Sequence, residues 1–122
     1  MKIILHILFV VIIVGGCQKD SVAHNNDKIV CDTNKPLEEL SWLRERVDGM
    51  KNNQSNAAIY SCNYGNQQGF LSDDCVNCPD GMSEFYDCQG NILCEFGGIA
   101  GLNTCPDFEA NLTDKVLIFE IK

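Results

Sequence analysis

The sequence is poor in positive charge and in histidine, and these two shortages exclude several classes of function. Nine lysine and arginine residues stand against 17 aspartates and glutamates, which gives a formal net charge of −8. A protein that binds nucleic acid needs a basic patch to meet the phosphates, and the sequence has no cluster of basic residues. The histidines are His6 and His24, so residues 31–122 contain no histidine for the Ser-His and Cys-His pairs of nucleophilic catalysis. We therefore expect no nucleic-acid binding and no enzyme.

The chain also lacks an apolar run long enough for a transmembrane helix. Residues 3–14 are nearly all aliphatic, but a bilayer core requires about 20 such residues. Lys2 precedes this run, and the small residues Val14-Gly15-Gly16 follow it, which is the arrangement of an export signal. We therefore predict that residues 1–16 are a signal peptide that is removed during export. The mature chain would then lose the charge of Lys2 and lie outside the cytoplasm.

Cys17 stands directly behind this segment and is the predicted lipidation site. The pattern Val14-Gly15-Gly16-Cys17 resembles the lipobox of bacterial lipoproteins. The resemblance implies cleavage before Cys17 and acylation of the new N-terminal cysteine. Several acyl chains together hold a protein firmly at a membrane. The alternative is an ordinary signal peptide that happens to have a cysteine near its cleavage site.

Two shorter resemblances follow Cys17. Gln18-Lys19-Asp20 is similar to the signals by which Bacteroidetes-type bacteria send lipoproteins to the outer leaflet of their outer membrane. Asp20-Ser21-Val22 resembles the acceptor sequence for O-glycosylation in the same group, which implies that Ser21 is a glycosylation site. We therefore expect a protein anchored in the outer membrane and displayed on the cell surface. An inward-facing location is the alternative.

Cysteine is the one residue type that the mature chain has in unusual abundance. Seven cysteines follow Cys17, namely Cys31, Cys62, Cys75, Cys78, Cys88, Cys94 and Cys105. In an oxidising compartment, such a density in a small domain indicates a disulfide framework. Seven is an odd number, so at least one thiol is free, modified, or paired between molecules. The spacing does not choose among the pairings, although a Cys94–Cys105 bridge would tie the glycine-rich loop between them.

The motif Cys75-x2-Cys78 leaves two other interpretations open. With Cys88 and Cys94 it would supply four sulfurs for a tetrahedral zinc ion. Cys88 and Cys94 are too far apart for a second CxxC motif, however, and no histidine lies near them. The same pair could be a redox dithiol, but Pro79-Asp80-Gly81 favours a turn after Cys78 over a helix. We favour structural disulfides and expect no metal and no cofactor.

The organisation predicted for the chain is a signal peptide, a lipidated flexible tether and one small domain. The tether covers residues 17–30, because its polar residues show no periodicity. The domain covers residues 31–122 and begins with a helix over residues 36–50. Leu37, Leu40, Leu43, Val47 and Met50 recur there at steps of three or four, which places them on one stripe.

Period-two patterns follow this helix and predict an antiparallel sheet. Residues 59–64 and 69–71 indicate one hairpin, and residues 83–86 and 92–96 indicate a second. The second hairpin would turn at residues 87–91, with Gly90 in the left-handed conformation. Residues 116–121 are apolar on both faces except for Glu120, which predicts a strand inside the sheet. The expected fold class is α+β, with one N-terminal helix packed on a small antiparallel sheet and stapled by disulfides.

Several segments of the domain resemble a family of short Bacteroidetes lipoproteins with a domain of unknown function. The resemblance covers residues 35–121. It rests on Pro36-Leu37-Glu38-Glu39-Leu40, Trp42-Leu43, Cys75-Val76-Asn77-Cys78-Pro79-Asp80-Gly81-Met82, Tyr86-Asp87-Cys88-Gln89-Gly90-Asn91, and residues 94–108 with Gly97-Gly98-Ile99-Ala100-Gly101. It implies the same location and one domain, and it brings no catalytic residues.

These observations favour a lipid-anchored surface protein that serves as a binding or structural module. Its partner would be a protein or a glycan, met by an exposed apolar or aromatic patch that includes Trp42, Tyr60 or Tyr64. The first alternative is a thiol or zinc protein centred on Cys75 and Cys78. The second is an accessory subunit of an envelope complex, linked to its partner through the odd thiol.

Overall fold

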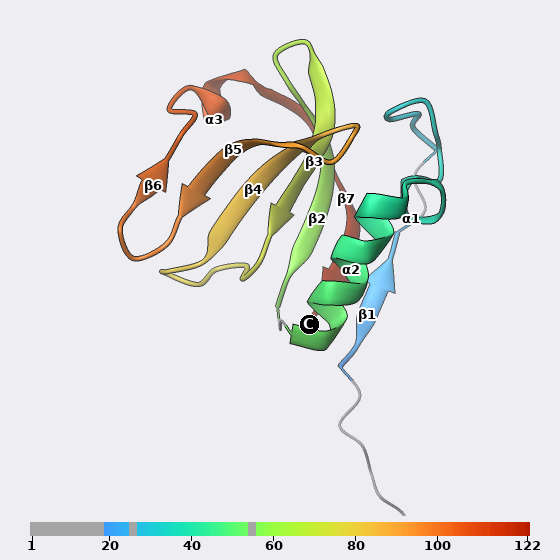
Figure 1. Cartoon of the computed structure of the whole chain (residues 1–122), viewed down its shortest axis with the longest axis horizontal. Coiled ribbons are helices and arrows are strands. Elements are labelled where there is room, and N and C mark those ends of the chain that lie inside the picture. Colours follow the sequence, from blue (N-terminus) through green and yellow to red (C-terminus); the bar gives the residue numbers. More distant parts are fainter. Residues whose placement is uncertain (1–18, 25–26, 54–55) are drawn as a thin grey trace, which may run out of the picture.

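In a computed structural model, residues 19–24, 27–53 and 56–122 are described, and they form a twisted antiparallel sheet with short helices (Figure 1). The helices are α1 (Pro36–Glu39), α2 (Ser41–Asn53) and α3 (Phe108–Asn111). The strands are β1 (Ser21–Ala23), β2 (Ala58–Tyr64), β3 (Gln67–Asp73), β4 (Met82–Asp87), β5 (Ile92–Gly97), β6 (Leu102–Asn103) and β7 (Leu112–Ile121).

The strands form one sheet in the order β1-β7-β2-β3-β4-β5-β6. Strands β2 to β6 follow one another as a meander, and every neighbouring pair is antiparallel. The C-terminal strand β7 returns to lie between β1 and β2. The interior position predicted for residues 116–121 is therefore confirmed, and the reason is that their apolar side chains need cover on both faces.

The two predicted hairpins are confirmed, and a pairing that joins them was not foreseen. Tyr64 pairs with Gln67, which leaves a two-residue turn in which Gly65 has a φ of 57°. In the second hairpin Gly90 has a φ of 88°, the left-handed conformation expected of it. Pairing of β3 with β4 then merges both hairpins into one sheet.

The sheet buries a different apolar cluster on each face. Because side chains alternate along a strand, Phe70 and Leu71 of β3 point to opposite sides. Phe70 belongs to the cluster beneath α2, which also contains Leu43, Val47, Met50, Ile59 and Phe119. Leu71 belongs to the cluster on the second sheet face, the side away from α2, with Cys62, Phe85, Cys94 and Phe108.

The predicted fold class, an N-terminal helix on a small sheet, is wrong. The described residues form a mostly β structure, in which a seven-stranded sheet is the bulk and the short helices make up 21%. The periodic patterns missed β1, which lies in a polar segment, and β6, which has two residues beside a glycine-rich loop. They also gave no sign that β3 and β4 pair, because that contact spans the Cys75–Cys78 loop.

The predicted single helix over residues 36–50 is also wrong, because it is divided at Leu40. Leu40 has extended backbone angles, so α1 ends there and α2 begins at the next residue. The break leaves the local carbonyl groups bonded: the Leu40 N–H donates to Pro36, and the Arg44 side chain donates to the Glu38 carbonyl. Leu37 and Leu40 still pack against the core, so the apolar spacing is the same with or without the break.

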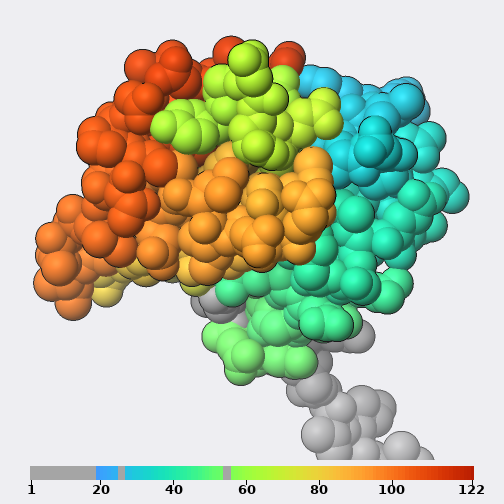
Figure 2. Space-filling model, turned by 45° about the horizontal axis from the view of Figure 1, so that its top comes forward, coloured from blue at the N-terminus to red at the C-terminus, as the bar shows by residue number. Residues whose placement is uncertain are grey.

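The tether predicted for residues 17–30 departs from the structure at β1. Ser21–Ala23 pair with residues 119–121 of β7, and the His24 N–H donates to the Ile118 carbonyl. Val30 and Thr33 are buried and form an isolated bridge. Figure 2 shows the blue and cyan N-terminal segment packed against the yellow-green β2–β3 hairpin and the orange β4–β5 hairpin. Ser21–Ala23, His24 and Val30 of this segment therefore pack with the rest of the domain.

Candidate functional site: a cavity on the second sheet face

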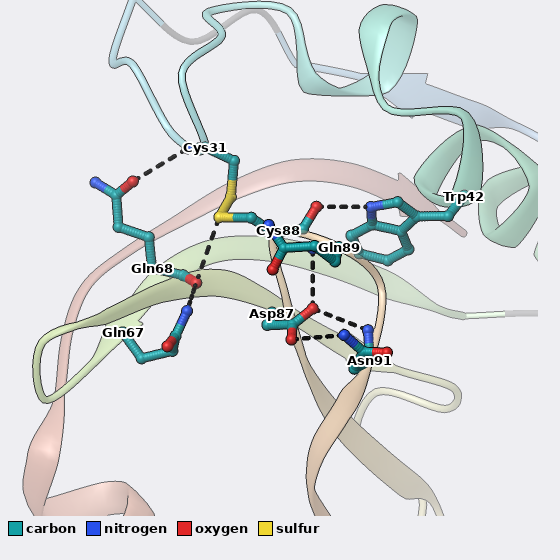
Figure 3. Close-up of a disulfide and its surroundings, with 8 residues drawn as sticks. All are labelled: Cys31, Trp42, Gln67, Gln68, Asp87, Cys88, Gln89 and Asn91. Atoms are coloured by element: carbon teal, nitrogen blue, oxygen red, sulfur yellow. Dashed lines mark hydrogen bonds between the residues drawn. A yellow bond between two sulfur atoms is a disulfide. The ribbon is translucent and has the colours of Figure 1, made fainter.

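A disulfide fixes the N-terminal segment to the β4–β5 hairpin (Figure 3). Cys31 is bonded to Cys88, 57 residues away at the end of β4. The Cys31 N–H donates to the Gln68 side chain over 3.1 Å, and the Trp42 indole N–H donates to the Cys88 carbonyl over 3.0 Å. The segment at Cys31, helix α2, the β2–β3 hairpin and the turn after β4 are therefore joined at one point.

The turn beside this disulfide is held by Asp87. One carboxylate oxygen accepts the backbone N–H groups of Gln89 and Asn91, and the other accepts the Asn91 side-chain amide, all at 2.9 Å. Burial alone would raise the pKa of Asp87, but these hydrogen bonds outweigh it and lower the pKa. The Trp42 ring lies against Gly90 on the other side. All these contacts stay within the chain, so the feature is structural.

Arg46 forms a charged cluster between α2 and the sheet. Its guanidinium meets Asp74 at 2.6 Å and Glu84 at 3.1 Å, and it donates to the Ser72 hydroxyl. Tyr86 donates its hydroxyl to Glu84, and burial followed by this hydrogen bond raises the pKa of Tyr86. Each charge has a partner inside the cluster, so it fastens α2 to the sheet.

The predicted disulfide framework is confirmed in the described part of the chain. Three disulfides are present, and Cys62 is the remaining thiol. Cys94 is bonded to Cys105 across the glycine-rich loop, as the sequence suggested. Cys75 is bonded to Cys78, which occupies the two sulfurs that a zinc site would need. Among the described residues, no group of three or more metal-ligating side chains comes together.

Cys62 lies in the core of the second sheet face and is 2% exposed. Burial raises the pKa of its thiol to about 11. A protonated, enclosed thiol is a poor nucleophile and a poor metal ligand. Cys62 is therefore an apolar core residue in this structure.

A cavity of about 220 Å³ opens on the second sheet face. Its apolar wall is formed by Leu71 of β3, Phe96 of β5 and Phe108 of α3. Phe108 is buried, and its ring packs on the rings of Phe85, Phe96 and Tyr64 at centroid distances of 5.4, 4.7 and 5.0 Å. Helix α3 thus closes one side of the cavity, and Phe108 lies there in a cluster of tilted aromatic rings.

Four polar side chains line the same cavity, and they come from four different elements. They are Asp73 at the end of β3, Ser83 in β4, Glu109 in α3 and Lys115 in β7. Within the described residues, the side chains of Asp73, Ser83 and Glu109 have no hydrogen-bond or ion-pair partner. The Lys115 ammonium lies 4.3 Å from the centroid of the Tyr60 ring. Burial, followed by the charge of Asp73, raises the pKa of Tyr60, which keeps its hydroxyl protonated.

The back of the cavity is backbone. Gly81 and Gly97 line it, and a Cβ on Gly97 would stand 2.1 Å from the Gly81 carbonyl oxygen. Any other residue at position 97 would therefore force β4 and β5 apart where they flank the opening. The φ of Gly97 is 100°, which is a second reason for glycine at this position.

Among the described residues, no other predicted site residue lines this cavity, although Tyr60 and Tyr64 contact side chains that do. Cys17 lies outside the described residues, and Ser21 is exposed in β1. Trp42 is half-buried against Phe70 and Tyr86, so it serves the core more than a surface patch. Tyr60 and Tyr64 are half-buried in the cluster on the second sheet face. In the portion that is described, no helix has the length and apolar character needed to cross a membrane.

Sequence reasoning missed the polar residues of the cavity. Asp73 and Glu109 are two of many acidic residues, and only the fold brings them to the same place as Lys115 and Ser83. Side chains alternate along residues 69–73, so Leu71 and Asp73 lie on the same face of the sheet. This placement could have been predicted from the sequence. Nothing in the sequence connects that face to α3, whose four residues show no period.

A family described as a domain of unknown function, DUF6970, matches residues 45–121, from the middle of α2 to the end of β7. No curated protein and no solved structure matches the chain. The matched range includes every residue that lines the cavity.

Proposed function

The chain belongs to the DUF6970 family, whose function is unknown, and from this premise we propose that it is a lipid-anchored binding module of the outer membrane of a Bacteroidetes-type bacterium. The cavity on the second sheet face is its binding site. The observation that carries the binding role is the mixed lining of this cavity, which combines apolar side chains with four polar ones, and three of these four have no partner among the described residues. Pockets that recognise ligands combine apolar surface with a few such polar groups.

The anchor part of the proposal is supported by the sequence around Cys17. Val14-Gly15-Gly16-Cys17 has the features of a lipobox, and Gln18-Lys19-Asp20 has those of a surface-export signal. Cys17 precedes β1 by four residues, and an extended chain of that length spans at most about 14 Å. The edge of the sheet at β1 would therefore lie close to the lipid headgroups. The whole chain has a net charge of −8 and all of its acidic residues follow Cys17, so the domain has no electrostatic attraction to anionic lipids and depends on the acyl chains.

Disulfides support a location outside the cytoplasm. Three of them in a domain of this size are typical of exported proteins and compensate for a small core. They also hold the cavity in shape, because Cys94–Cys105 ties β5 to the loop that leads into α3. A preformed site binds with a smaller loss of conformational entropy.

The anchor is tested by labelling cells with radioactive palmitate. We expect the full-length protein to incorporate label and the Cys17→Ser variant to lose it. Cys62→Ser is the matched control, because it changes a cysteine in the domain and leaves the lipobox intact. Surface display is tested on intact cells with an impermeant biotin reagent that reacts with lysines. Incorporation of label by both the Cys17→Ser and the Cys62→Ser variants would contradict the anchor. So would a lack of label in both the wild type and Cys62→Ser.

A second candidate function is thiol exchange at Cys75 and Cys78. The observation that favours it is the half-buried disulfide between these two residues, separated by three positions in a connecting loop. In such a reaction, two thiols of a partner protein would give two electrons and two protons to this disulfide. Cys75 and Cys78 would become thiols, and the partner would become oxidised. A Cys75→Ala, Cys78→Ala double variant that retains full function in cells would exclude this candidate.

The remaining candidate is an accessory subunit of an envelope complex. In that interpretation, the unpaired cysteine would form the link to the partner. The unpaired cysteine is Cys62, which is enclosed in the core and cannot reach another protein in this structure. An accessory role would therefore act through a surface. The exposed apolar side chains on and between β5 and β6, namely Ile92, Leu93, Ile99 and Leu102, are candidates for such contacts.

A further inference from the structure

We propose that the cavity on the second sheet face binds one pyranose ring of a neutral saccharide. This inference rests on the proposed binding function and names its ligand class. Its first support is size. A cavity of about 220 Å³ lies below the range of about 300–1,000 Å³ that encloses drug-sized ligands, so it suits a single small ring.

The second support is that the lining combines apolar and polar side chains. Leu71, Phe96 and Phe108 form the apolar part of the lining. A pyranose ring has an apolar face of C–H groups, which can lie against this part, and a rim of hydroxyl groups. The ring of Phe96 is half-buried, so part of its surface is available for this contact. An aliphatic ligand would leave the polar side chains of the cavity unpaired, which is costly.

The third support is the presence of both hydrogen-bond donors and acceptors. The carboxylates of Asp73 and Glu109 accept, the Lys115 ammonium donates, and the Ser83 hydroxyl does both. Each sugar hydroxyl also donates and accepts, so this set is complementary to a polyol. Hydrogen bonds to charged groups are the stronger ones, and three of the four side chains are charged.

Charge argues against the ionic alternatives. A phosphate or a uronic acid would meet the carboxylates of Asp73 and Glu109 on a molecule with a net charge of −8. A lysine or arginine side chain of a peptide would meet the Lys115 ammonium, which is already placed over the Tyr60 ring. A neutral ligand meets neither repulsion.

The inference is tested with the full-length lipoprotein, purified in a detergent that has no sugar headgroup. Neutral disaccharides of glucose, galactose, mannose and N-acetylglucosamine are titrated, and binding is followed by saturation-transfer NMR and calorimetry. We expect at least one to bind saturably with a Kd of about 0.1–10 mM, which is the range for a small ligand with few contacts. Glu109→Gln and Lys115→Met should each weaken this binding by about tenfold.

The matched controls are Glu45→Gln and Lys51→Met on α2, which make the same chemical changes on the opposite face. Both should bind as the wild type does. The inference is overturned if no disaccharide binds saturably up to about 20 mM. It is also overturned if the cavity variants bind as tightly as the controls.

The two proposals fail in different ways. Suppose that palmitate labelling depends on Cys17, and that a photo-crosslinker at position 115 captures a protein while no sugar binds. The anchored binding module then stands and the saccharide is wrong. If a disaccharide binds and Glu109→Gln weakens it, but Cys17→Ser still incorporates palmitate, the saccharide stands and the anchor is wrong.

Discussion

The buried thiol of Cys62 makes the stability of the domain depend on pH in the alkaline range. Its pKa is raised from 9.0 to about 11 in the folded chain, because burial favours the neutral form. Between these values the unfolded chain loses the proton first, so the free energy of unfolding falls as pH rises. It has its full value below about pH 9 and loses about 3 kcal/mol by pH 11, since one pKa unit corresponds to about 1.4 kcal/mol. Denaturant unfolding at a series of pH values measures this loss.

The control for this prediction is Cys62→Ala. Tyr60, Tyr64 and Tyr86 also have raised pKa values and lower the stability in the same range, but they are present in both proteins. The variant is expected to be less stable at pH 7, because it leaves a small cavity. Its free energy of unfolding should nevertheless fall less steeply above pH 9. Parallel pH profiles of the two proteins would show that the thiol is accessible to solvent.

Two glycines separate the effect of backbone conformation from that of packing. Gly90 and Gly101 both have a positive φ, but a Cβ at Gly90 would stand 2.7 Å from the Trp42 ring, whereas nothing lies within 4 Å of one at Gly101. We expect Gly101→Ala to cost about 1–2 kcal/mol from its backbone conformation alone. Gly90→Ala should cost a further 1–3 kcal/mol or so, because the Trp42 ring must move. Thermal unfolding of both variants measures the difference, and equal losses would contradict the packing contact.

At the scale of single residues, the sequence predicts the local conformation of some residues but not which distant residues share a site. The turn at residues 87–91 follows from local chemistry, because Asp87 and Gly90 determine its conformation within five positions. The cavity does not follow from local chemistry. Asp73 and Lys115 line the same cavity only because β7 returns to lie beside β2, and the order of strands is a property of the whole chain.

Among the elements of the fold, the disulfides differ in how much chain they constrain. The segments closed by Cys31–Cys88, Cys94–Cys105 and Cys75–Cys78 have sequence separations of 57, 11 and 3. A cross-link stabilises a protein mainly by limiting its unfolded state, and the effect grows with the length of the closed loop. Replacing both cysteines by alanine should therefore cost about 4 kcal/mol for the first pair, about 3 for the second and under about 2 for the third.

The three double variants are compared by urea unfolding at one pH, and the order of the losses is the result to check. The Cys31 and Cys88 variant should also lose protection of the N-terminal segment in hydrogen exchange, because this disulfide joins that segment to β4. If the Cys75 and Cys78 variant were the least stable, the prediction from loop length would be wrong. The disulfide between β3 and β4 would then stabilise the sheet more than its short loop accounts for.

The elements also show where periodicity is informative. The long strands and α2 were recognisable, because apolar residues repeat along them with the period of a strand or a helix. Strand β6 has two residues, and β1 has three exposed ones, so neither contains a repeat. The break at Leu40 is invisible for a different reason: Leu37, Leu40 and Leu43 face the core whether the helix is continuous or divided. Those three features together account for the error in fold class.

On the scale of the whole molecule, β1 is the element that protects the sheet from association. It covers the edge of β7, whose residues Ile118, Phe119 and Ile121 are buried. A chain that begins at residue 28 would lose the β1–β7 pairing, including the bond from the His24 N–H to Ile118 and that from the Lys122 N–H to Asp20. At about 0.5–1.5 kcal/mol for each bond, the truncated protein should be less stable by about 2–4 kcal/mol.

The truncated protein should also associate, because an uncovered strand edge pairs readily with another chain. Size-exclusion chromatography and light scattering would detect dimers of residues 28–122 at concentrations where residues 19–122 are monomeric. The control keeps the length and replaces residues 19–24 by a Gly-Ser sequence, which should pair poorly and behave as the truncation does. Equal stability and a monomeric state in all three proteins would mean that β1 contributes nothing to the sheet. Residues 19–24 would then be the flexible tether that the sequence predicts.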